Sequence, residues 1–379
     1  MKVTIDATSA LLRSAGVKSY TYHWLRHLRS QASPDDEIRA FPYINNWDRL
    51  EHSRSALPTW ATLPRIALLH SVNLVGSPLL DRVLKGVDIF HASNQVRCAP
   101  RGVRLTATLH DLTCWLMPEL HTAANVRADR NFAERILRRA DGLIAVSENT
   151  RQDAIRLLGI APERITTIHS GVAEEYFSAG AGVAGGPVQR FARRNRPYVV
   201  CVGAIEPRKN IATLLDAWGM LKPSLRSEFE LVIAGPEGWN SEAVMARIQA
   251  QGAQLGVRYL GYVPQAELPG LLAGAAVCAY PSLYEGFGLP VVEAMAAGTP
   301  VLTSNNSCLP EIAGEAALLV DPRSAAEIAQ GLTRLLESKP ESEAERNRRA
   351  QLGRARAEQF RWERCATRTL EFFRRVMGR

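Results

Sequence analysis

Short apolar runs alternate with helical patterns along the whole chain, and this alternation constrains the fold more than any other feature. The predicted strands span residues 3–6, 38–41, 87–91, 105–109, 142–146 and 165–168, then 198–203, 230–234, 257–260, 275–280, 300–303 and 317–320. Predicted helices between them include 17–29, 128–139, 149–158, 211–221 and 241–255. Strands that alternate with helices form parallel sheets covered by helices on both faces. Because the pattern occurs twice in 379 residues, it predicts two doubly wound α/β domains.

A glycine-rich stretch without periodicity, residues 179–187, is typical of a linker. We therefore expect a first domain at 1–187 and a second at 188–360. The stretch contains G-x-G-x-x-G at residues 180–185, but no predicted strand enters it and no helix leaves it. We do not interpret it as a dinucleotide-binding motif. Residues 361–379 form a predicted helix that follows the second domain and returns to the first.

The net charge of +8 favours anionic partners. Nucleic acid is not expected, because basic and aromatic residues are not interleaved and no known binding motif is present. Six scattered cysteines without paired spacing fit a reduced cytoplasmic compartment, and no apolar signal segment precedes the strand at 3–6. The longest uncharged stretch, 66–80, is shorter than the roughly 18 apolar residues of a spanning helix. It is expected to be a core-facing helix and loop, with contact at a membrane interface as the alternative.

Two glutamates flank a glycine-containing turn after the predicted strand 275–280. Glu285 lies on the loop, and Glu293 is expected in the first turn of a helix in which Pro290 is the first residue. Gly286 and Gly288 allow the backbone to turn and to bring its N–H groups close to a ligand. Carboxylates at the carboxyl end of a parallel strand suit sugar or ribose hydroxyls, because they only accept hydrogen bonds. The alternative is a loop acid in solvent and an acid that complements the helix dipole.

Two adjacent cations, Arg208 and Lys209, follow the first predicted strand of the second domain. Asn210 is a candidate N-cap for the helix at 211–221. Because ligands of open parallel sheets bind at the carboxyl ends of the strands, these cations should lie near Glu285 and Glu293. An arginine fork and a lysine point charge both suit a diphosphate, whereas the alternative is an exposed turn with solvated charges.

The Arg208-Lys209-Asn210 run, together with Glu285-x7-Glu293, resembles the retaining glycosyltransferases of family 4. The segments 232–236, 260–263, 281–290 and 293–298 carry the motifs of that family, and the resemblance covers nearly the whole chain. It implies the GT-B architecture: two facing Rossmann-like doubly wound domains, with a C-terminal helix that crosses back to the first.

The resemblance also implies roles for individual residues of the second domain. Arg208 and Lys209 would hold the pyrophosphate of a sugar nucleotide and stabilise the leaving group. Glu293 would accept hydrogen bonds from the ribose, and Glu285 would lie near the transferred sugar. The remaining expected donor contacts are the backbone around Gly286, Phe287, Gly288 and Leu289, and the base-side loop at Tyr262 and Val263.

The first domain matches the family less closely. Residues 13–20 stand where the family has a glycine-rich loop, and only Gly16 is left to contact phosphate or acceptor. The run Leu109-His110-Asp111-Leu112 resembles a histidine loop found in bacterial polysaccharide enzymes, many of them mannosyltransferases. His110 would position a hydroxyl of the donor sugar or the acceptor, and the alternative is a histidine that only completes a strand end. Ser147 is expected to cap the helix at 149–158.

The chain has no Asp-x-Asp motif, so neither a metal nor another cofactor is expected, and Arg208 and Lys209 would neutralise the diphosphate. The resemblance implies retention of anomeric configuration and domain closure over the donor.

The function expected from the resemblance is hexose transfer from a nucleotide diphosphate sugar to a glycan or lipid-linked acceptor in polysaccharide biosynthesis. GDP-mannose is the first choice of donor, with UDP-glucose and other donors open. The enzyme is expected to be cytoplasmic, with peripheral contact to an anionic membrane surface. The alternatives are a sugar-nucleotide epimerase or a phosphorylase-like enzyme on the same architecture, and a non-catalytic glycan-binding scaffold.

Overall fold

The computed structural model describes residues 1–12, 16–45, 47, 50–52, 54–179 and 196–378. The chain divides into two compact units, residues 1–171 with 361–379, and residues 172–360. The expected domain boundary at 187/188 and the G-x-G-x-x-G stretch lie outside the described residues. Each unit is described separately below.

The first unit contains a sheet of six parallel strands in the order β2-β1-β3-β4-β5-β6. The strands are β1 (Lys2–Asp6), β2 (Glu37–Phe41), β3 (Ile89–Ala92), β4 (Arg104–Leu109), β5 (Gly142–Ala145) and β6 (Ile165–Thr167). The chain leaves β1 toward β2 on one side and then returns to β3 on the other. The carboxyl ends of β1 and β3 therefore form the point at which the strand order reverses, where open α/β sheets bind ligands.

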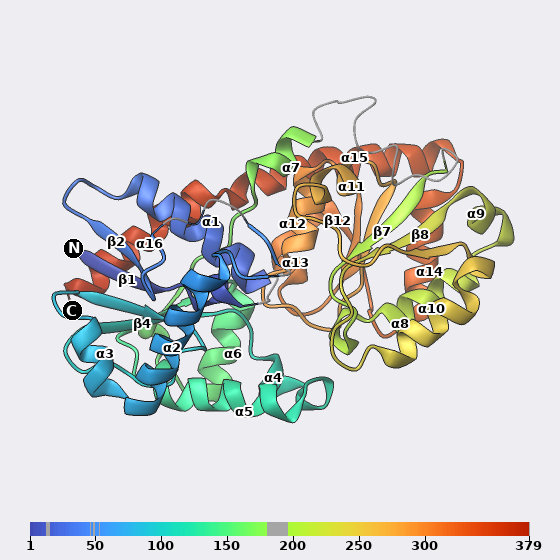
Figure 1. Cartoon of the computed structure of the whole chain (residues 1–379). Coiled ribbons are helices and arrows are strands. Elements are labelled where there is room, and N and C mark those ends of the chain that lie inside the picture. The colour runs from blue at the N-terminus through green and yellow to red at the C-terminus, as the bar shows by residue number, and fades with distance from the viewer. Residues whose placement is uncertain (13–15, 46, 48–49, 53, 180–195, 379) are drawn as a thin grey trace. The chain divides into compact units, whose positions relative to one another are not determined.

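Helices cover both faces of this sheet (Figure 1). They are α1 (Gly16–Gln31), α2 (Thr59–Val75), α3 (Ser77–Val83), α4 (Thr113–Leu116), α5 (Ala123–Phe132), α6 (Glu148–Leu158) and α16 (Trp362–Met377). The terminal helix α16 packs along α1, and the Trp24 indole donates a 3.0 Å hydrogen bond to Thr369 Oγ1. Helices α2, α3 and α6 contribute to a buried apolar cluster with the strands. The C-terminal segment is thus part of the first unit.

The second unit repeats the plan with six parallel strands in the order β12-β11-β10-β7-β8-β9. The strands are β7 (Tyr198–Val202), β8 (Glu230–Ala234), β9 (Val257–Tyr259), β10 (Val277–Tyr280), β11 (Val301–Ser304) and β12 (Ala317–Val320). All residues of β7, β8 and β10 are buried, as expected for parallel strands covered on both faces. The strand order reverses between β7 and β10.

The helices of the second unit form the two covering layers (Figure 1). They are α7 (Glu174–Ala179), α8 (Ile211–Met220), α9 (Pro223–Glu228), α10 (Glu242–Leu255), α11 (Leu268–Ala273), α12 (Leu289–Ala296), α13 (Leu309–Ala313), α14 (Ala325–Leu336) and α15 (Pro340–Ala357). Helices α8, α10 and α14 share one large buried apolar cluster. Helix α12 packs against α7, α11 and α15.

Every strand predicted from the sequence is present within two residues of its expected bounds, and the doubly wound architecture is confirmed. The predicted cap of Ser147 is also confirmed, because its hydroxyl accepts a hydrogen bond from the Thr150 N–H at 3.1 Å. The helix expected at 128–139 is present as α5 followed by a π-helical turn, Ala133–Leu137.

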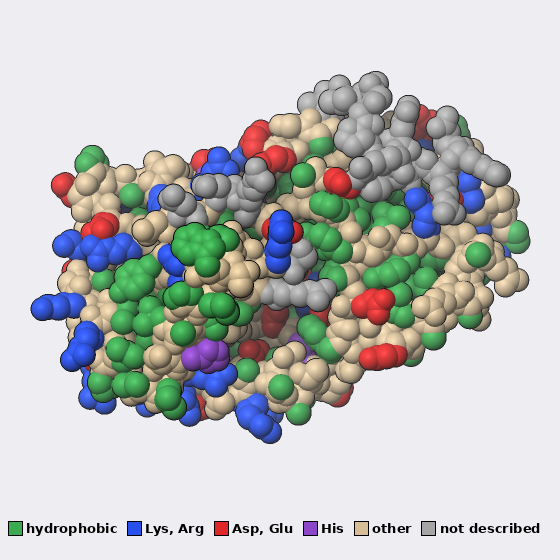
Figure 2. All heavy atoms as spheres, in the orientation of Figure 1, with side chains coloured by type: hydrophobic (Ala, Val, Ile, Leu, Met, Phe, Trp, Pro, Cys, Tyr) green, Lys and Arg blue, Asp and Glu red, His purple; other side chains and the backbone are tan. Residues whose placement is uncertain are grey.

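The uncharged stretch 66–80 is only partly a core element. In α2, Leu69 and Val72 are buried, whereas Trp60, Leu63 and Leu74 on the opposite side are 78%, 61% and 88% exposed. Figure 2 shows apolar side chains gathered over this helix. None of the helices in the described part of the chain has the length and apolar character that a membrane span requires.

Candidate functional site

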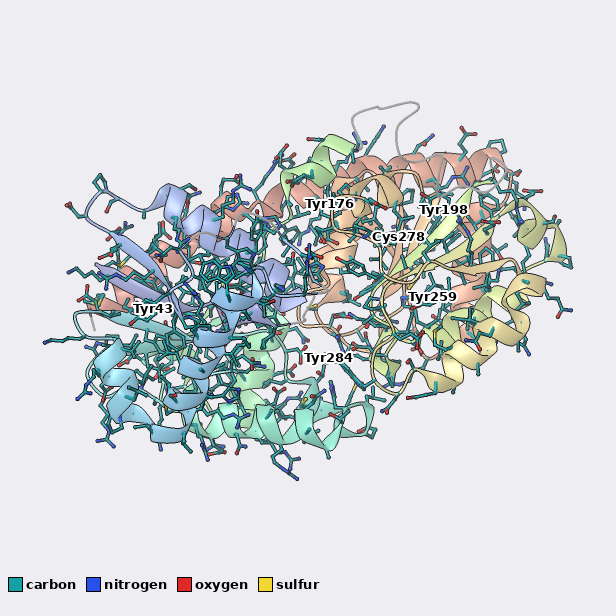
Figure 3. All side chains as sticks on the ribbon, viewed as in Figure 1. Tyr43, Tyr176, Tyr198, Tyr259, Cys278 and Tyr284 are labelled. Atoms are coloured by element: carbon teal, nitrogen blue, oxygen red, sulfur yellow. The ribbon has the colours of Figure 1, made fainter. Side chains whose placement is uncertain are left out.

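The predicted cations and the first glutamate come together at the carboxyl ends of β7 and β10, two neighbouring strands. Arg208 and Lys209 lie on a short 3₁₀ turn, Pro207–Lys209, that follows β7. Glu285 lies on the loop between β10 and α12, next to Tyr284, which Figure 3 labels. This is the reversal point of the strand order, and so the expected ligand-binding edge of the unit.

The carboxylate of Glu285 is the centre of this cluster and is 6% exposed. Its Oε2 accepts a 2.7 Å hydrogen bond from Arg208 Nη1. Its Oε1 accepts hydrogen bonds from Lys209 Nζ at 2.6 Å, from the Tyr280 hydroxyl at 2.8 Å and from the Ser282 hydroxyl at 2.6 Å. Glu285 is therefore bound on both oxygens by groups that fix its orientation.

These contacts decide the ionisation of the cluster. Burial alone would raise the pKa of Glu285, but Arg208 and Lys209 outweigh it and lower the pKa to about 2. Burial and the nearby Glu285 charge raise the pKa of Tyr280 well above its usual value, so its phenol stays protonated and donates to the carboxylate. The second acid, Glu206, accepts a 2.8 Å hydrogen bond from Arg208 Nη2.

The lysine has donor capacity left for a ligand. An ammonium group has three N–H donors. Two of them go to Tyr280 and Glu285 among the described residues. The Lys209 side chain is 13% exposed, so one donor can be offered to an anion from a partly exposed position at the sheet edge.

Three members of this cluster were not singled out from the sequence. Tyr280 and Ser282 stand at the end of an apolar run, and the pattern there indicates only a strand residue and a turn residue. Glu206 likewise has the appearance of an ordinary acidic residue in a turn. The available signal is their spacing: Tyr280 and Ser282 lie five and three residues before Glu285, and Glu206 lies two before Arg208.

The predicted N-cap at Asn210 is wrong. Its side chain makes no capping hydrogen bond to the helix backbone. Its amide instead donates to the carbonyls of Pro281 and Pro322 at 2.9 and 2.6 Å, and its oxygen accepts from the Thr213 hydroxyl at 2.7 Å. Asn210 therefore ties the cation turn to the loop that carries Glu285.

Glu293 lies in a different environment from Glu285. The sequence predicted Pro290 as the first residue of this helix and Glu293 in its first turn. Helix α12 instead begins at Leu289, so Pro290 is its second residue and Glu293 lies in the second turn. Burial raises the pKa of Glu293 to about 7, partly offset by a hydrogen bond from Tyr176. Tyr176 lies on α7 and is labelled in Figure 3. Its hydroxyl also accepts a 3.0 Å hydrogen bond from Gln265 Nε2.

The loop entering α12 presents its backbone rather than its side chains. Phe287 is buried, and its ring packs edge-on against Phe360. Gly288 has a φ of +85°, and a Cβ there would come within 2.7 Å of Leu309 Cδ2. Gly286 is buried and Leu289 starts the helix, so a ligand at this end would meet N–H groups of the first turn. On the base-side loop, Tyr262 is 37% exposed and Val263 is buried.

The two residues predicted in the first unit lie in different settings. Gly16 is the exposed first residue of α1, has no positive φ, and a Cβ there would meet no atom within 4 Å. The loop residues 13–15 before it lie outside the described residues. Nothing described in the structure around Gly16 requires glycine.

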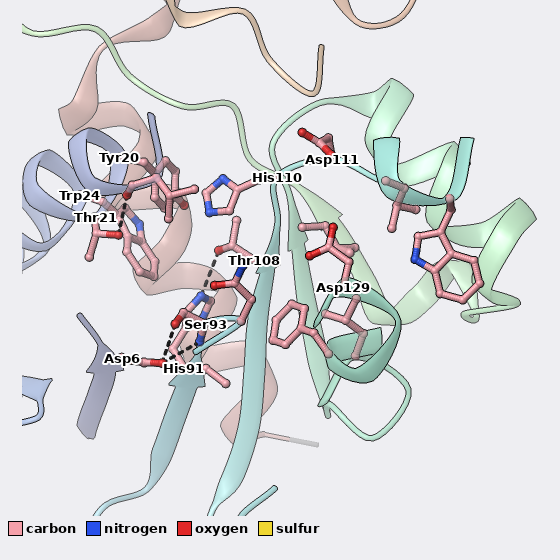
Figure 4. A pocket seen from close by; sticks show the side chains of 18 residues that line it. Asp6, Tyr20, Thr21, Trp24, His91, Ser93, Thr108, His110, Asp111 and Asp129 are labelled. Atoms are coloured by element: carbon pink, nitrogen blue, oxygen red, sulfur yellow. Dashed lines mark hydrogen bonds between the residues drawn. The ribbon is translucent and has the colours of Figure 1, made fainter. Parts of the chain in front are cut away.

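His110 follows β4 and lines a pocket with Asp6, Tyr20 and Asp111 at the carboxyl ends of β1, β3 and β4 (Figure 4). Its ring packs edge-on against Tyr20 at 4.8 Å between centroids. Burial lowers the pKa of His110 to about 4, opposed by the charge of Asp111, so the imidazole is neutral near pH 7. A neutral imidazole offers one donor and one acceptor. Within the described ranges no group of three or more His, Cys, Asp and Glu side chains is arranged to hold a metal ion.

Both halves of the chain match known protein families. Residues 188–356 match the family described as glycosyl transferases group 1, and residues 14–176 match glycosyltransferase family 4. The O-antigen chain mannosyltransferase B of Escherichia coli is 34% identical over 76% of this chain and 74% of its own length. The MMP alpha-(1->4)-mannosyltransferase of Mycolicibacterium hassiacum is 32% identical over 65% of this chain and 57% of its own length.

Solved structures share the fold at low sequence identity. The sucrose-phosphate synthase of Thermosynechococcus elongatus has a TM-score of 0.74 at 20% identity, with 100% of this chain and 99% of that chain covered. The Anabaena protein HepE in complex with UDP-glucose has a TM-score of 0.70 at 19% identity, with 98% of each chain covered. With these matches over both halves, the chain belongs to the glycosyltransferases of group 1 and family 4.

Proposed function

We propose that this protein is a retaining glycosyltransferase that moves mannose from GDP-mannose to a glycan or lipid-linked glycan acceptor in polysaccharide biosynthesis. The observation that carries the proposal is the Arg208–Lys209–Glu285 cluster at the strand reversal of the unit that matches the group 1 family. The choice of mannose is supported by relatives at 34% and 32% identity that are named as mannosyltransferases.

The cations are proposed to bind the diphosphate of the donor. When the bond between the sugar C1 and the phosphate oxygen breaks, negative charge develops on the leaving diphosphate. Hydrogen bonds to Glu285 hold Arg208 and Lys209 in place before the reaction, so the proposed stabilisation needs no reorganisation. The acceptor oxygen bonds to C1 on the face that the leaving group vacates, and its proton passes to the leaving phosphate oxygen.

Oε2 of Glu285 accepts one hydrogen bond from the described side chains, that of Arg208, so it can also accept one from a sugar hydroxyl. We propose this contact with the transferred sugar beside a structural role of Glu285, which is to hold Arg208 and Lys209 in place. Glu293 is proposed to accept hydrogen bonds from the ribose, with the neighbouring Tyr176 and Gln265 fixing its orientation. His110, as a neutral imidazole, is proposed to bind a sugar hydroxyl, and no metal is proposed to take part.

A donor panel tests this function. Purified protein is incubated with GDP-mannose, UDP-glucose, ADP-glucose or UDP-N-acetylglucosamine, with and without a mannose oligosaccharide, and nucleoside diphosphate release and product mass are measured. GDP-mannose is expected to give the fastest transfer, with an α-linked product by NMR and undiminished rate in EDTA. Transfer from another donor would move the proposal to that sugar, and no transfer from any donor would overturn it.

A second proposal concerns location: the enzyme works in the cytoplasm, and the exposed side of α2 rests on an anionic membrane surface. Trp60, Leu63 and Leu74 form an exposed apolar side, and two exposed cations lie nearby, Arg82 on the neighbouring α3 and Lys85 just after that helix. Aromatic and apolar side chains beside cations are what an anionic lipid surface binds.

Vesicle flotation tests this contact. Binding is expected to vesicles that contain anionic lipid, to fall with salt, and to fall severalfold in a Trp60→Ser/Leu63→Ser variant. Met220→Ser is a matched control, because Met220 is an exposed apolar residue of the second unit, 62% exposed. Equal binding by both variants and the wild type would contradict a contact through α2.

A further inference from the structure

The pocket of the first unit is lined by carboxylates, histidines and aromatic rings, and none of the described residues that line it is lysine or arginine. Its volume is about 190 Å³, against the ~10–15 Å³ that one water molecule needs, so it has room for a ligand of several heavy atoms. Figure 4 shows the acids Asp6, Asp111 and Asp129 around it, with His110 between Tyr20 and Asp129.

The three acids differ in whether their carboxylate oxygens can accept a further hydrogen bond from a ligand. Asp6 is committed to the protein, since its oxygens accept from the Thr8 N–H at 3.0 Å and from the Ser93 hydroxyl at 2.5 Å. Asp111 uses Oδ1 to accept from the N–H and hydroxyl of Thr113, while its Oδ2 makes no hydrogen bond to a described residue. Asp129 is partly buried, and burial raises its pKa, opposed by a hydrogen bond from Cys114. Asp111 and Asp129 are therefore the acids that can face a ligand.

A buried hydroxyl on the other side of the pocket also lacks a good partner. Tyr20 is 3% exposed, and its hydroxyl makes no hydrogen bond of normal geometry to the described residues, although Thr108 lies nearby. Burial raises the pKa of Tyr20 well above its usual value, so the phenol is a donor at neutral pH. A buried polar group without a partner costs free energy unless a ligand or water completes it. Together with neutral His110, the pocket offers both donors and acceptors to a ligand.

On the basis of the proposed transfer reaction, we infer that this pocket binds an uncharged sugar ring of the acceptor glycan and that Asp111 and Asp129 exclude rings carrying phosphate or carboxylate. Hydroxyls of a neutral sugar can donate to the two carboxylates and pair with His110 and Tyr20. An anionic substituent would be buried beside like charges, and none of the described lining residues offers it a cation; such unpaired charge is how a site rejects a wrong partner.

A cation that contacts a lining residue does not change this conclusion. Arg130 is exposed, and its guanidinium carbon lies 5.6 Å from the ring centroid of Trp115. It is not among the residues that line the pocket. The histidines add no positive charge, because burial lowers the pKa values of His91 and His110 to about 3 and about 4.

A matched pair of acceptors tests the inference: a mannose oligosaccharide and the same oligosaccharide phosphorylated at C6 of its terminal ring. The wild type is expected to prefer the neutral acceptor by about tenfold or more in kcat/KM. The Asp111→Asn/Asp129→Asn variant should lose most of that preference, whereas Asp111→Glu/Asp129→Glu should keep it. Asp35→Asn is the control: it removes one exposed charge of the same unit at a residue that does not line the pocket. Its preference between the two acceptors should equal that of the wild type.

Binding measurements separate this inference from the proposed reaction. Saturation-transfer NMR with methyl α-mannoside reports the pocket, and calorimetry with GDP reports the donor site; circular dichroism confirms that the variants fold. If no donor supports transfer, the proposed reaction fails, while loss of methyl mannoside contact in the Asn variant still supports the pocket. Preference for the phosphorylated acceptor, an unchanged preference in the Asn variant, or an effect on donor KM alone would overturn the inference.

Discussion

The two glutamates of the second unit differ in ionisation because their neighbours differ. Glu285 is buried among cations and its pKa is lowered to about 2, whereas Glu293 is buried beside a phenol and its pKa is raised to about 7. The stability contributed by Glu285 is present above its ordinary pKa of 4.5 and is lost as the pH falls toward 2. Glu293 works in the opposite direction: the folded protein keeps its proton when the unfolded chain has lost it, so stability falls as the pH rises from 4.5 to 7.

Opposite melting shifts follow for the two amide variants. Glu293→Gln is expected to raise the melting temperature at pH 8, where ionised Glu293 costs about 3 kcal/mol, and to change it little at pH 4.5. Glu285→Gln is expected to lower the melting temperature at both pH values, because Arg208 and Lys209 lose their counter-ion. Calorimetric melting of both variants checks this, and shifts of the same sign at pH 8 would contradict the assignments.

Tyr280 is predicted to position Lys209, the lysine that we propose to bind the donor. Its hydroxyl accepts from Lys209 and donates to Glu285, so Tyr280→Phe keeps the ring and removes both contacts. We expect kcat to fall about tenfold, since one hydrogen bond to a charged group contributes roughly 1.5–3 kcal/mol, while the KM for the acceptor stays unchanged. Steady-state kinetics and a melting curve check this. An unchanged kcat in a folded variant would show that Lys209 does not depend on the phenol.

At the scale of the element, the loop that enters α12 requires glycine in one place. Gly288 has a positive φ and no space for a Cβ, so Gly288→Ala is expected to cost about 1–3 kcal/mol of unfolding free energy. Gly16→Ala is the comparison: it begins α1 in open space and should change stability by less than about 0.5 kcal/mol. Urea unfolding of both variants measures these two changes in unfolding free energy. Loss of transfer in a stable Gly16→Ala protein would show that a ligand requires that glycine.

The elements themselves were largely predictable from the sequence because a buried parallel strand is a short apolar run, and β7, β8 and β10 are such runs. The cation pair and Glu285 were predictable as neighbours because strand ends of a parallel sheet meet at one edge. The hydrogen-bond partners of individual side chains could not be predicted from the sequence. Asn210 has the composition of a cap but bonds to two carbonyls that come from later in the chain. Tyr280 belongs to an apolar run, and only tertiary contacts reveal its use.

The buried face of helix α2 could not be predicted from the sequence either. Its sequence is apolar on both faces, so the pattern could not tell which face is buried. The structure buries Leu69 and Val72 and leaves Trp60 and Leu74 in solvent. Packing against the rest of the unit decides which face of α2 is buried, so only the structure shows which face is exposed.

At the scale of the whole molecule, the last helix is a structural part of the first unit. Trp362, Phe372 and Phe373 of α16 are buried, and Thr369 accepts the Trp24 hydrogen bond. Burying three such aromatic side chains contributes several kcal/mol, a large share of the ~5–15 kcal/mol of a domain.

Truncation after Phe360 is therefore expected to remove the unfolding transition of the first unit and to leave GDP binding by the second. Arg374→Ala removes an ion pair between an exposed arginine and Asp36, which keeps its second partner at the N-terminus, and should cost less than about 1 kcal/mol. Differential scanning calorimetry distinguishes the two variants. A truncated protein with an unchanged thermogram would contradict the role given to α16.

The central claim is that Arg208 and Lys209 form the diphosphate site of a sugar nucleotide, with Glu285 holding them. Calorimetric titration with the sugar nucleotides of the donor panel tests it most directly, on the wild type and on Arg208→Ala/Lys209→Ala. The account predicts saturable binding of at least one sugar nucleotide by the wild type and a loss of about a hundredfold or more in the double variant. Equal affinity in the folded double variant, or no binding of any sugar nucleotide by the wild type, would contradict it.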